Sequence, residues 1–130
     1  MTAAKDLKSL TQLTDAAFAA QQAKMGALRQ AAQNLRDKLT ALDGARKARA
    51  LSLTEADPAL LAGADLLWQS WIEQRRAALN GELSRNLVAQ DKARAALALA
   101  FGRNQATEAL AARAARDRII AKTRRDDASS

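Results

Sequence analysis

Apolar side chains recur at alternating intervals of three and four residues in the first half of the chain. The clearest run is Met25, Leu28, Ala32, Leu35, Leu39 and Leu42. This spacing keeps one stripe of an α-helix apolar, as in the seam of a coiled coil. We therefore predict a long helix over about residues 3–51 that packs its stripe against another helix.

The apolar stripe weakens at both ends of this predicted helix. Toward the N-terminus it loses its apolar character at Thr11 and Thr14. Leucines with a different spacing then follow, at Leu7, Leu10 and Leu13. This change predicts a shift of register, or stutter, near Thr14. Toward the C-terminus the stripe reaches Arg46 and Arg49, so the apolar seam is predicted to end there.

The only proline, Pro58, separates this helix from a second long helical stretch. Proline lacks a backbone N–H and has a fixed φ, so it suits the first turn of a helix and disrupts a helix interior. Asp57 precedes it and is a good N-cap, because its carboxylate accepts hydrogen bonds from free N–H groups of the first turn. Thr54 is an alternative cap, and the sequence does not decide between the two.

The predicted fold is all-α: two long helices in an antiparallel coiled-coil hairpin, with the second helix longer than the first. The turn is expected at about residues 52–57, the second helix at about 58–122 and a frayed tail at 123–130. We expect residues beyond about Gly102 to have little or no partner within the chain. Gly81 and Gly102 are the candidate positions for a bend, because glycine weakens a helix interior.

Composition supports long, thin helices over a globular core. The chain has 34 alanines among 130 residues and only 3% aromatic residues. Alanine is the strongest helix former but buries little apolar area. The sequence therefore favours helices that pack along a narrow seam, and the whole chain is predicted to be one such domain.

The residue types argue against catalysis. Cysteine and histidine are absent, which removes disulfides, thiolate nucleophiles, the usual zinc ligands and the commonest general base. No glycine-rich phosphate loop occurs. Carboxylates such as Glu73, Glu82 and Asp91 are better explained as a solvated helix face than as an acid/base pair. We predict a protein that is not an enzyme and has no metal, cofactor or small-molecule substrate.

The net charge of +7 is concentrated toward both ends of the chain. Residues 1–52 hold nine Lys/Arg against four Asp/Glu, residues 103–130 seven against four, and residues 53–102 five against six. Such a field attracts acidic proteins, nucleic acid or anionic lipid. The chain has no apolar run long enough to span a bilayer and no signal-like N-terminus, so a cytoplasmic location is expected.

Two features leave alternatives open. Trp68 and Trp71 either widen the core near the turn, or one of them is exposed as a binding anchor. The basic C-terminal stretch, which includes Arg113, Arg116 and Arg124, either binds phosphates or is an ordinary solvated face. Nucleic-acid binding is disfavoured there because no aromatic residues are interleaved with the basic ones.

The layout resembles the FliJ family of bacterial flagellar and type III export proteins. Two segments support this resemblance: Trp68-Gln-Ser-Trp71-Ile72-Glu-Gln-Arg75-Arg76, and Phe101-Gly-Arg-Asn-Gln-Ala-Thr-Glu108-Ala-Leu110. The second segment is similar to the family's "Glu-Lys-Leu" region, with Ala109 at the position of the lysine. The resemblance implies a non-enzymatic stalk in the hexameric export ATPase that also contacts the export gate at the inner membrane.

The resemblance also implies site residues. The export-gate contacts would be Leu35, Leu39, Leu42, Arg46, Trp68, Ile72, Arg75 and Leu79. The ATPase-ring contacts would be Arg103, Glu108, Leu110, Arg113, Arg116 and Arg124. The alternative is a generic basic coiled-coil protein that binds nucleic acid or associates with itself into a helical bundle.

Overall fold

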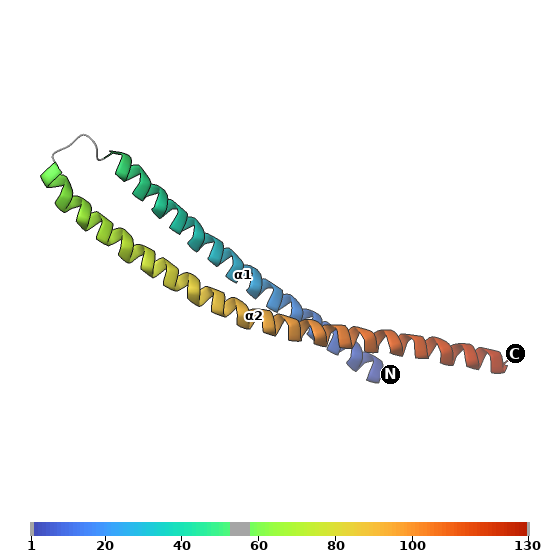
Figure 1. Ribbon diagram of the computed structural model, residues 1–130. Coiled ribbons are helices and arrows are strands. Elements are labelled where there is room, and N and C mark those ends of the chain that lie inside the picture. The colour runs from blue at the N-terminus through green and yellow to red at the C-terminus, as the bar shows by residue number, and fades with distance from the viewer. Residues whose placement is uncertain (1, 53–57, 130) are drawn as a thin grey trace. The chain divides into compact units, whose positions relative to one another are not determined.

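A computed structural model describes residues 2–52 and 58–129, and both stretches are helical (Figure 1). Helix α1 spans Thr2–Ser52 and helix α2 spans Pro58–Ser129. The two helices pack against each other, which confirms the prediction of an all-α chain whose second helix is longer. The predicted caps Thr54 and Asp57 lie outside the described residues.

Helix α2 is longer and more regular than the sequence predicts. It runs without a break through Gly81 and Gly102 and continues past Lys122 to Ser129, so the tail predicted to fray is helical. Arg124, Arg125 and Ala128 in this tail are residues that favour helix. Local bonds add support, since the Ser129 hydroxyl donates to the carbonyl of Asp126.

The buried and half-buried residues of α1 form one stripe, apart from Asp43. They are Leu7, Thr11, Thr14, Phe18, Gln21, Met25, Leu28, Ala32, Leu35, Leu39, Leu42 and Arg49. This stripe keeps its spacing through Thr11 and Thr14, so the predicted stutter near Thr14 is wrong. Leu10 and Leu13 are 42% and 66% exposed and lie outside the stripe.

Helix α2 presents a matching stripe with the same alternating spacing. Its members are Ile72, Leu79, Leu83, Asn86, Gln90, Ala93, Leu97, Ala100, Asn104, Thr107, Ala111 and Ala114. Small and polar residues make up more than half of this stripe. The contact between the helices is therefore narrow and partly polar.

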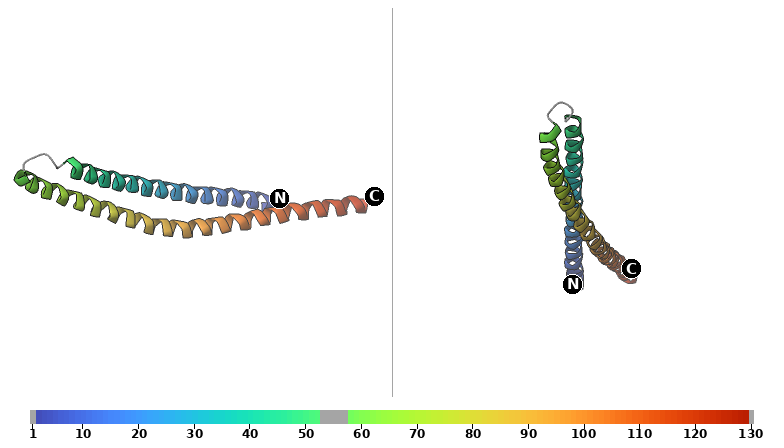
Figure 2. Two further views of the ribbon diagram at one scale, coloured as in Figure 1. Left: turned by 45° about the horizontal axis from the view of Figure 1, so that its top comes forward. Right: turned by 60° about the vertical axis from the view of Figure 1, so that its left-hand side comes forward.

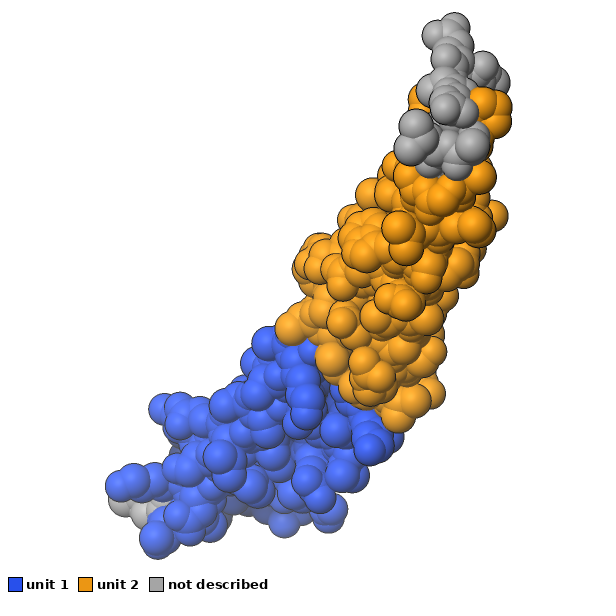
Figure 3. All heavy atoms as spheres, turned by 90° about the vertical axis from the view of Figure 1, so that its left-hand side faces the viewer, with its two compact units in different colours: residues 1–25, 92–130 blue, residues 26–91 orange. Residues whose placement is uncertain are grey.

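The chain divides into two compact units, shown in different colours in Figure 3. Unit 1 contains residues 1–25 and 92–130, and unit 2 contains residues 26–91. Each unit therefore contains a segment of α1 and a segment of α2.

Unit 2 has the larger apolar side chains in its core. Leu35, Ile72 and Leu79 are buried between its two helices, which lie side by side in both views of Figure 2. A polar link adds to this packing. Asn86 Nδ2 donates to the carbonyl of Leu28 at 3.0 Å. The Asn86 side-chain oxygen in turn accepts from Gln90 Nε2 at 2.7 Å, so these buried amides are hydrogen-bonded.

Unit 1 is held together by small residues and by hydroxyl groups. The Thr14 Oγ1 atom lies 2.7 Å from Thr107 Oγ1, where either hydroxyl can donate, and 3.1 Å from the acceptor Asn104 Oδ1. The rings of Phe18 and Phe101 pack with their centroids 5.5 Å apart.

These contacts correct the expectation that residues beyond about Gly102 lack a partner within the chain. Asn104 and Thr107 contact α1, and Ala111 and Ala114 are half-buried. The reason is the pairing of the helices: Thr14 lies opposite Thr107, so residues of α2 near and beyond Gly102 meet the first turns of α1.

The hydroxyl cluster predicts energetic coupling across the seam of unit 1. Thr14→Val and Thr107→Val should each lower the free energy of unfolding by about 0.5–1.5 kcal/mol, because each removes a hydrogen bond between the two helices. The loss of stability in the double variant should be smaller than the sum of the two single losses by about 0.5–1 kcal/mol, because the two residues are in contact. Urea denaturation followed by circular dichroism measures all three. Thr40→Val is the control, because the exposed Thr40 hydroxyl donates only to the nearby Arg36 carbonyl. Additive losses would show that the hydroxyl pair is not formed.

The seam also contains an acceptor without a donor. Gln21 Oε1 is buried and has no hydrogen-bond partner within the described chain. Gln21→Leu should raise the free energy of unfolding by about 1 kcal/mol, because it removes an unpaired polar atom and adds apolar burial. The neighbouring Gln22 is exposed, so Gln22→Leu should change stability by less than about 0.5 kcal/mol. A destabilised Gln21→Leu variant in urea titrations would show that the glutamine is paired in solution.

Candidate partner-binding surfaces

In unit 2 the seam continues through an arginine that packs on a tryptophan. The Arg49 guanidinium carbon lies 4.6 Å from the centroid of the Trp68 ring. Its Nε atom lies 3.5 Å from Asp65 Oδ1. Trp68 is half-buried, and the cation above its face is a favourable contact. The apolar part of the seam thus ends at Arg49, as the sequence predicts, and its last contact is a cation–π pair.

The second tryptophan is available to a partner. Trp71 is 56% exposed and borders a shallow groove of about 340 Å³ between the helices of unit 2. The groove is lined by Lys38, Ala41, Leu42, Ala45, Trp68, Trp71, Ile72, Arg75 and Leu79. The two tryptophans therefore differ: Trp68 packs in the seam, as a core residue would, whereas Trp71 is the exposed one.

Most of the predicted export-gate residues lie in the seam of unit 2. Leu35, Ile72 and Leu79 are buried, whereas Leu39, Leu42 and Trp68 are half-buried. Only the two arginines of the set, Arg46 and Arg75, are exposed. A partner on this surface could touch the groove but could not reach the side chain of Leu35 while the helices are packed.

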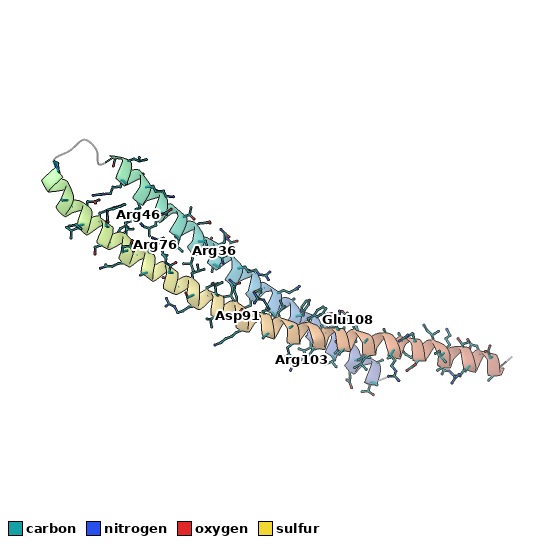
Figure 4. All side chains as sticks on the ribbon, viewed as in Figure 1. Arg36, Arg46, Arg76, Asp91, Arg103 and Glu108 are labelled. Atoms are coloured by element: carbon teal, nitrogen blue, oxygen red, sulfur yellow. The ribbon has the colours of Figure 1, made fainter. Side chains whose placement is uncertain are left out.

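Arg46 lies at the opposite edge of the seam from the groove. Its Nη1 atom is 3.9 Å from Glu73 Oε1, and both side chains are more than half exposed. Such a surface pair contributes little to stability. Arg46 and Arg76 border a narrow cleft with Leu39, Asp43 and Ile72, and Figure 4 labels both arginines. The predicted gate set is thus spread over two sides of unit 2.

The sequence prediction missed Lys38, Ala41 and Ala45, which line the groove beside Leu42. Their spacing gave one signal: Lys38 precedes Leu42 by one turn and Ala45 follows it by almost one turn, so both flank the seam.

Positive charge is concentrated in unit 1. This unit contains twelve Lys/Arg against six Asp/Glu, whereas unit 2 contains nine against eight. The predicted ring contacts Arg103, Glu108, Leu110, Arg113, Arg116 and Arg124 are all exposed and all belong to unit 1. They do not form one face, since Arg103 and Glu108 leave α2 on different sides in Figure 4. Every residue from 116 to 129 is exposed, so this end of α2 is accessible along its whole circumference.

Among the described residues there is no group of three or more acidic, histidine or cysteine side chains that could hold a metal ion. No helix in the described ranges is long and apolar enough to cross a membrane. The chain matches no protein-family model, no curated protein and no solved structure. The most distinctive surface features of the described residues are the groove beside Trp71 in unit 2 and the positive charge of unit 1.

The different surroundings of the two tryptophans predict different mutational effects. Trp68→Ala should lower the free energy of unfolding by about 1–3 kcal/mol, because it removes the partly buried ring beneath Arg49. Trp71→Ala should change it by less than about 0.5 kcal/mol, as an exposed substitution does. Chemical denaturation of both variants, followed by circular dichroism, measures the difference. Equal losses would place both rings in the core.

Proposed function

We propose that the two helices form an antiparallel coiled-coil hairpin. The order of contacts supports this arrangement. In unit 1, Thr14 pairs with Thr107 while the later residue Phe18 packs on the earlier Phe101. In unit 2, contacts that follow along α1 likewise meet earlier residues of α2: Leu28 with Asn86, Arg46 with Glu73, and Arg49 with Asp65. The alternating spacing of three and four residues on both helices is that of a coiled coil.

This hairpin acts, in our proposal, as a non-enzymatic stalk or adaptor of a flagellar-type protein export ATPase. The observation that carries the proposal is the charge distribution: unit 1, which contains both chain ends, has an excess of six positive charges, and unit 2 an excess of one. A basic unit is attracted to a ring with an acidic lumen and is oriented by it. The exposed arginines at positions 113, 116 and 124 supply part of that charge.

Unit 2 would supply the second contact, to the export gate. Its groove beside the exposed Trp71 has the composition of a partner site, with an aromatic anchor, aliphatic walls and cations at the rim. Arg75 and Lys38 are those cations. A protein with one contact at the ATPase and another at the gate would work in the cytoplasm at the inner face of the membrane.

Nucleic-acid binding is the competing function for the same basic surface. The aromatic residues of unit 1 do not favour it. Phe18 and Phe101 are the only aromatics there, and since Phe18 is half-buried, the 47% exposed Phe101 is at most a single ring on which a base could stack.

The stalk proposal predicts that charge reversal in unit 1 abolishes activation of the ATPase. Arg113→Glu, Arg116→Glu and Arg124→Glu together should remove the stimulation of ATP hydrolysis that the chain gives a purified export ATPase. The reason is that reversed charges repel an acidic lumen. Steady-state phosphate release with and without the chain measures the effect.

The matched control is a triple reversal in unit 2, at Arg29, Arg36 and Arg85. These arginines are exposed, and the change in total charge is the same. The control should stimulate as the wild type does. Full stimulation by the unit 1 variant, or salt-sensitive binding of the wild type to duplex DNA without any effect on the ATPase, would reject the stalk.

A further inference from the structure

One side of unit 1 is an apolar face that the chain itself does not cover. A groove of about 260 Å³ runs between the helices there, lined by Thr14, Ala17, Ala20, Gln21, Ala96, Leu99, Ala100 and Arg103. Leu99 is 55% exposed although it lines this groove. Ala17 and Ala20 are also exposed.

The heptad spacing extends this face along both helices. Leu10 and Leu13 precede Ala17 and Ala20 by seven residues, two helical turns, so they lie on the same side of α1. Both leucines are exposed.

On α2 the same spacing adds two more residues. Ala106 follows Leu99 by seven residues, and Leu110 follows Arg103 by seven. Leu110 is 51% exposed. The contact between Thr14 and Thr107 places the leucines of α1 opposite this stretch of α2.

The other side of unit 1 is different in character. Its groove is lined by Ala4, Lys5, Leu7, Lys8, Thr11, Gln12, Ala111 and Arg118. Three lysines or arginines and a glutamine border it, and no exposed leucine does. The exposed leucines of unit 1 are therefore gathered on one side only. An exposed apolar patch of this kind on a two-helix unit is typical of an interaction site.

The charges around the apolar face indicate what covers it. Arg103 lines the groove, and Arg113 and Lys24 continue the same side of α2 and α1 at heptad spacing. Two acidic residues also lie on this side, each one heptad from a leucine of the face: Asp6 precedes Leu13 and Asp117 follows Leu110. A partner with carboxylates beside its apolar stripe would complement these cations.

A second copy of the chain fits this surface poorly. Unit 1 has an excess of six positive charges, so two copies joined through it would bring like charges together. A groove between two helices has the shape that a single further helix fills.

We propose that this face of unit 1 binds one amphipathic helix of an acidic partner protein, with leucine and alanine on its buried stripe and glutamate or aspartate on its flanks. The face accepts such a helix whether or not the chain serves an export ATPase. If no such helix binds, the outcome expected of the ATPase experiment does not change.

The test uses a designed helical peptide of about 20 residues, long enough to be helical when docked. One version has leucine and alanine on one stripe with glutamate on both flanks, and a second has lysine in place of every glutamate. Fluorescence anisotropy of the labelled peptides measures affinity for the full chain. The glutamate peptide should bind at least about tenfold more tightly than the lysine peptide.

A double variant locates the site. Leu13→Asp with Leu99→Asp should weaken binding of the glutamate peptide by about tenfold or more, because both leucines are exposed anchors of the face. The matched control is Ile119→Asp with Leu87→Asp. These residues are exposed as well, the charge change is identical, and neither lies on the face. The control should bind within about twofold of the wild type at moderate ionic strength.

Four results would overturn the proposal. They are no binding of the glutamate peptide at millimolar concentration, equal affinity for the lysine peptide, and equal loss in the control variant. The fourth is a wild-type dimer in sedimentation that Leu13→Asp with Leu99→Asp dissociates, which would assign the face to a second copy.

Hydrogen exchange locates the bound peptide directly. We expect the glutamate peptide to protect amides in residues 10–20 and 96–110 and not elsewhere.

Discussion

The narrow seam between α1 and α2 is the contact on which the rest of this structure depends. Alanine and polar residues together occupy more than half of its positions, and a buried alanine contributes much less than the roughly 1.5–3 kcal/mol of a buried leucine or isoleucine. Only a few large side chains, such as Met25, Ile72 and Leu79, are deeply buried. The helices are long enough to compensate, because many small contacts add along their length.

Polar contacts give the seam its alignment. The alternating spacing of the stripes repeats after seven residues, so apolar packing alone distinguishes poorly between registers that differ by one heptad. The bond from Asn86 to the Leu28 carbonyl and the contact between Thr14 and Thr107 do distinguish them, because a shifted helix would lose these hydrogen bonds between the helices. One such contact lies in each unit.

A narrow seam also leaves large side chains outside. Two thin helices have little interior, so Leu13, Leu99 and Trp71 remain exposed. The two units differ in what they expose. Unit 2 is near neutral and has a groove beside an exposed tryptophan, whereas unit 1 is basic and has an apolar face on one side. Because the core holds few large residues, each unit has an exposed apolar surface of its own.

The sequence by itself determined the two helices, the position of the break before Pro58 and the stripe from Met25 to Leu42. These features depend on local helix propensity and on the period of 3.6 residues per turn, and both can be recognised in the sequence of a single helix. Only the tertiary structure decided that Thr11 and Thr14 belong to the seam. A threonine there is tolerated because its partners come from a helix some ninety residues away in the sequence. The same holds for the predicted sites. Whether Leu35 is buried or Trp71 is exposed depends on which side of each helix contacts the other helix, and the sequence of one helix does not specify this.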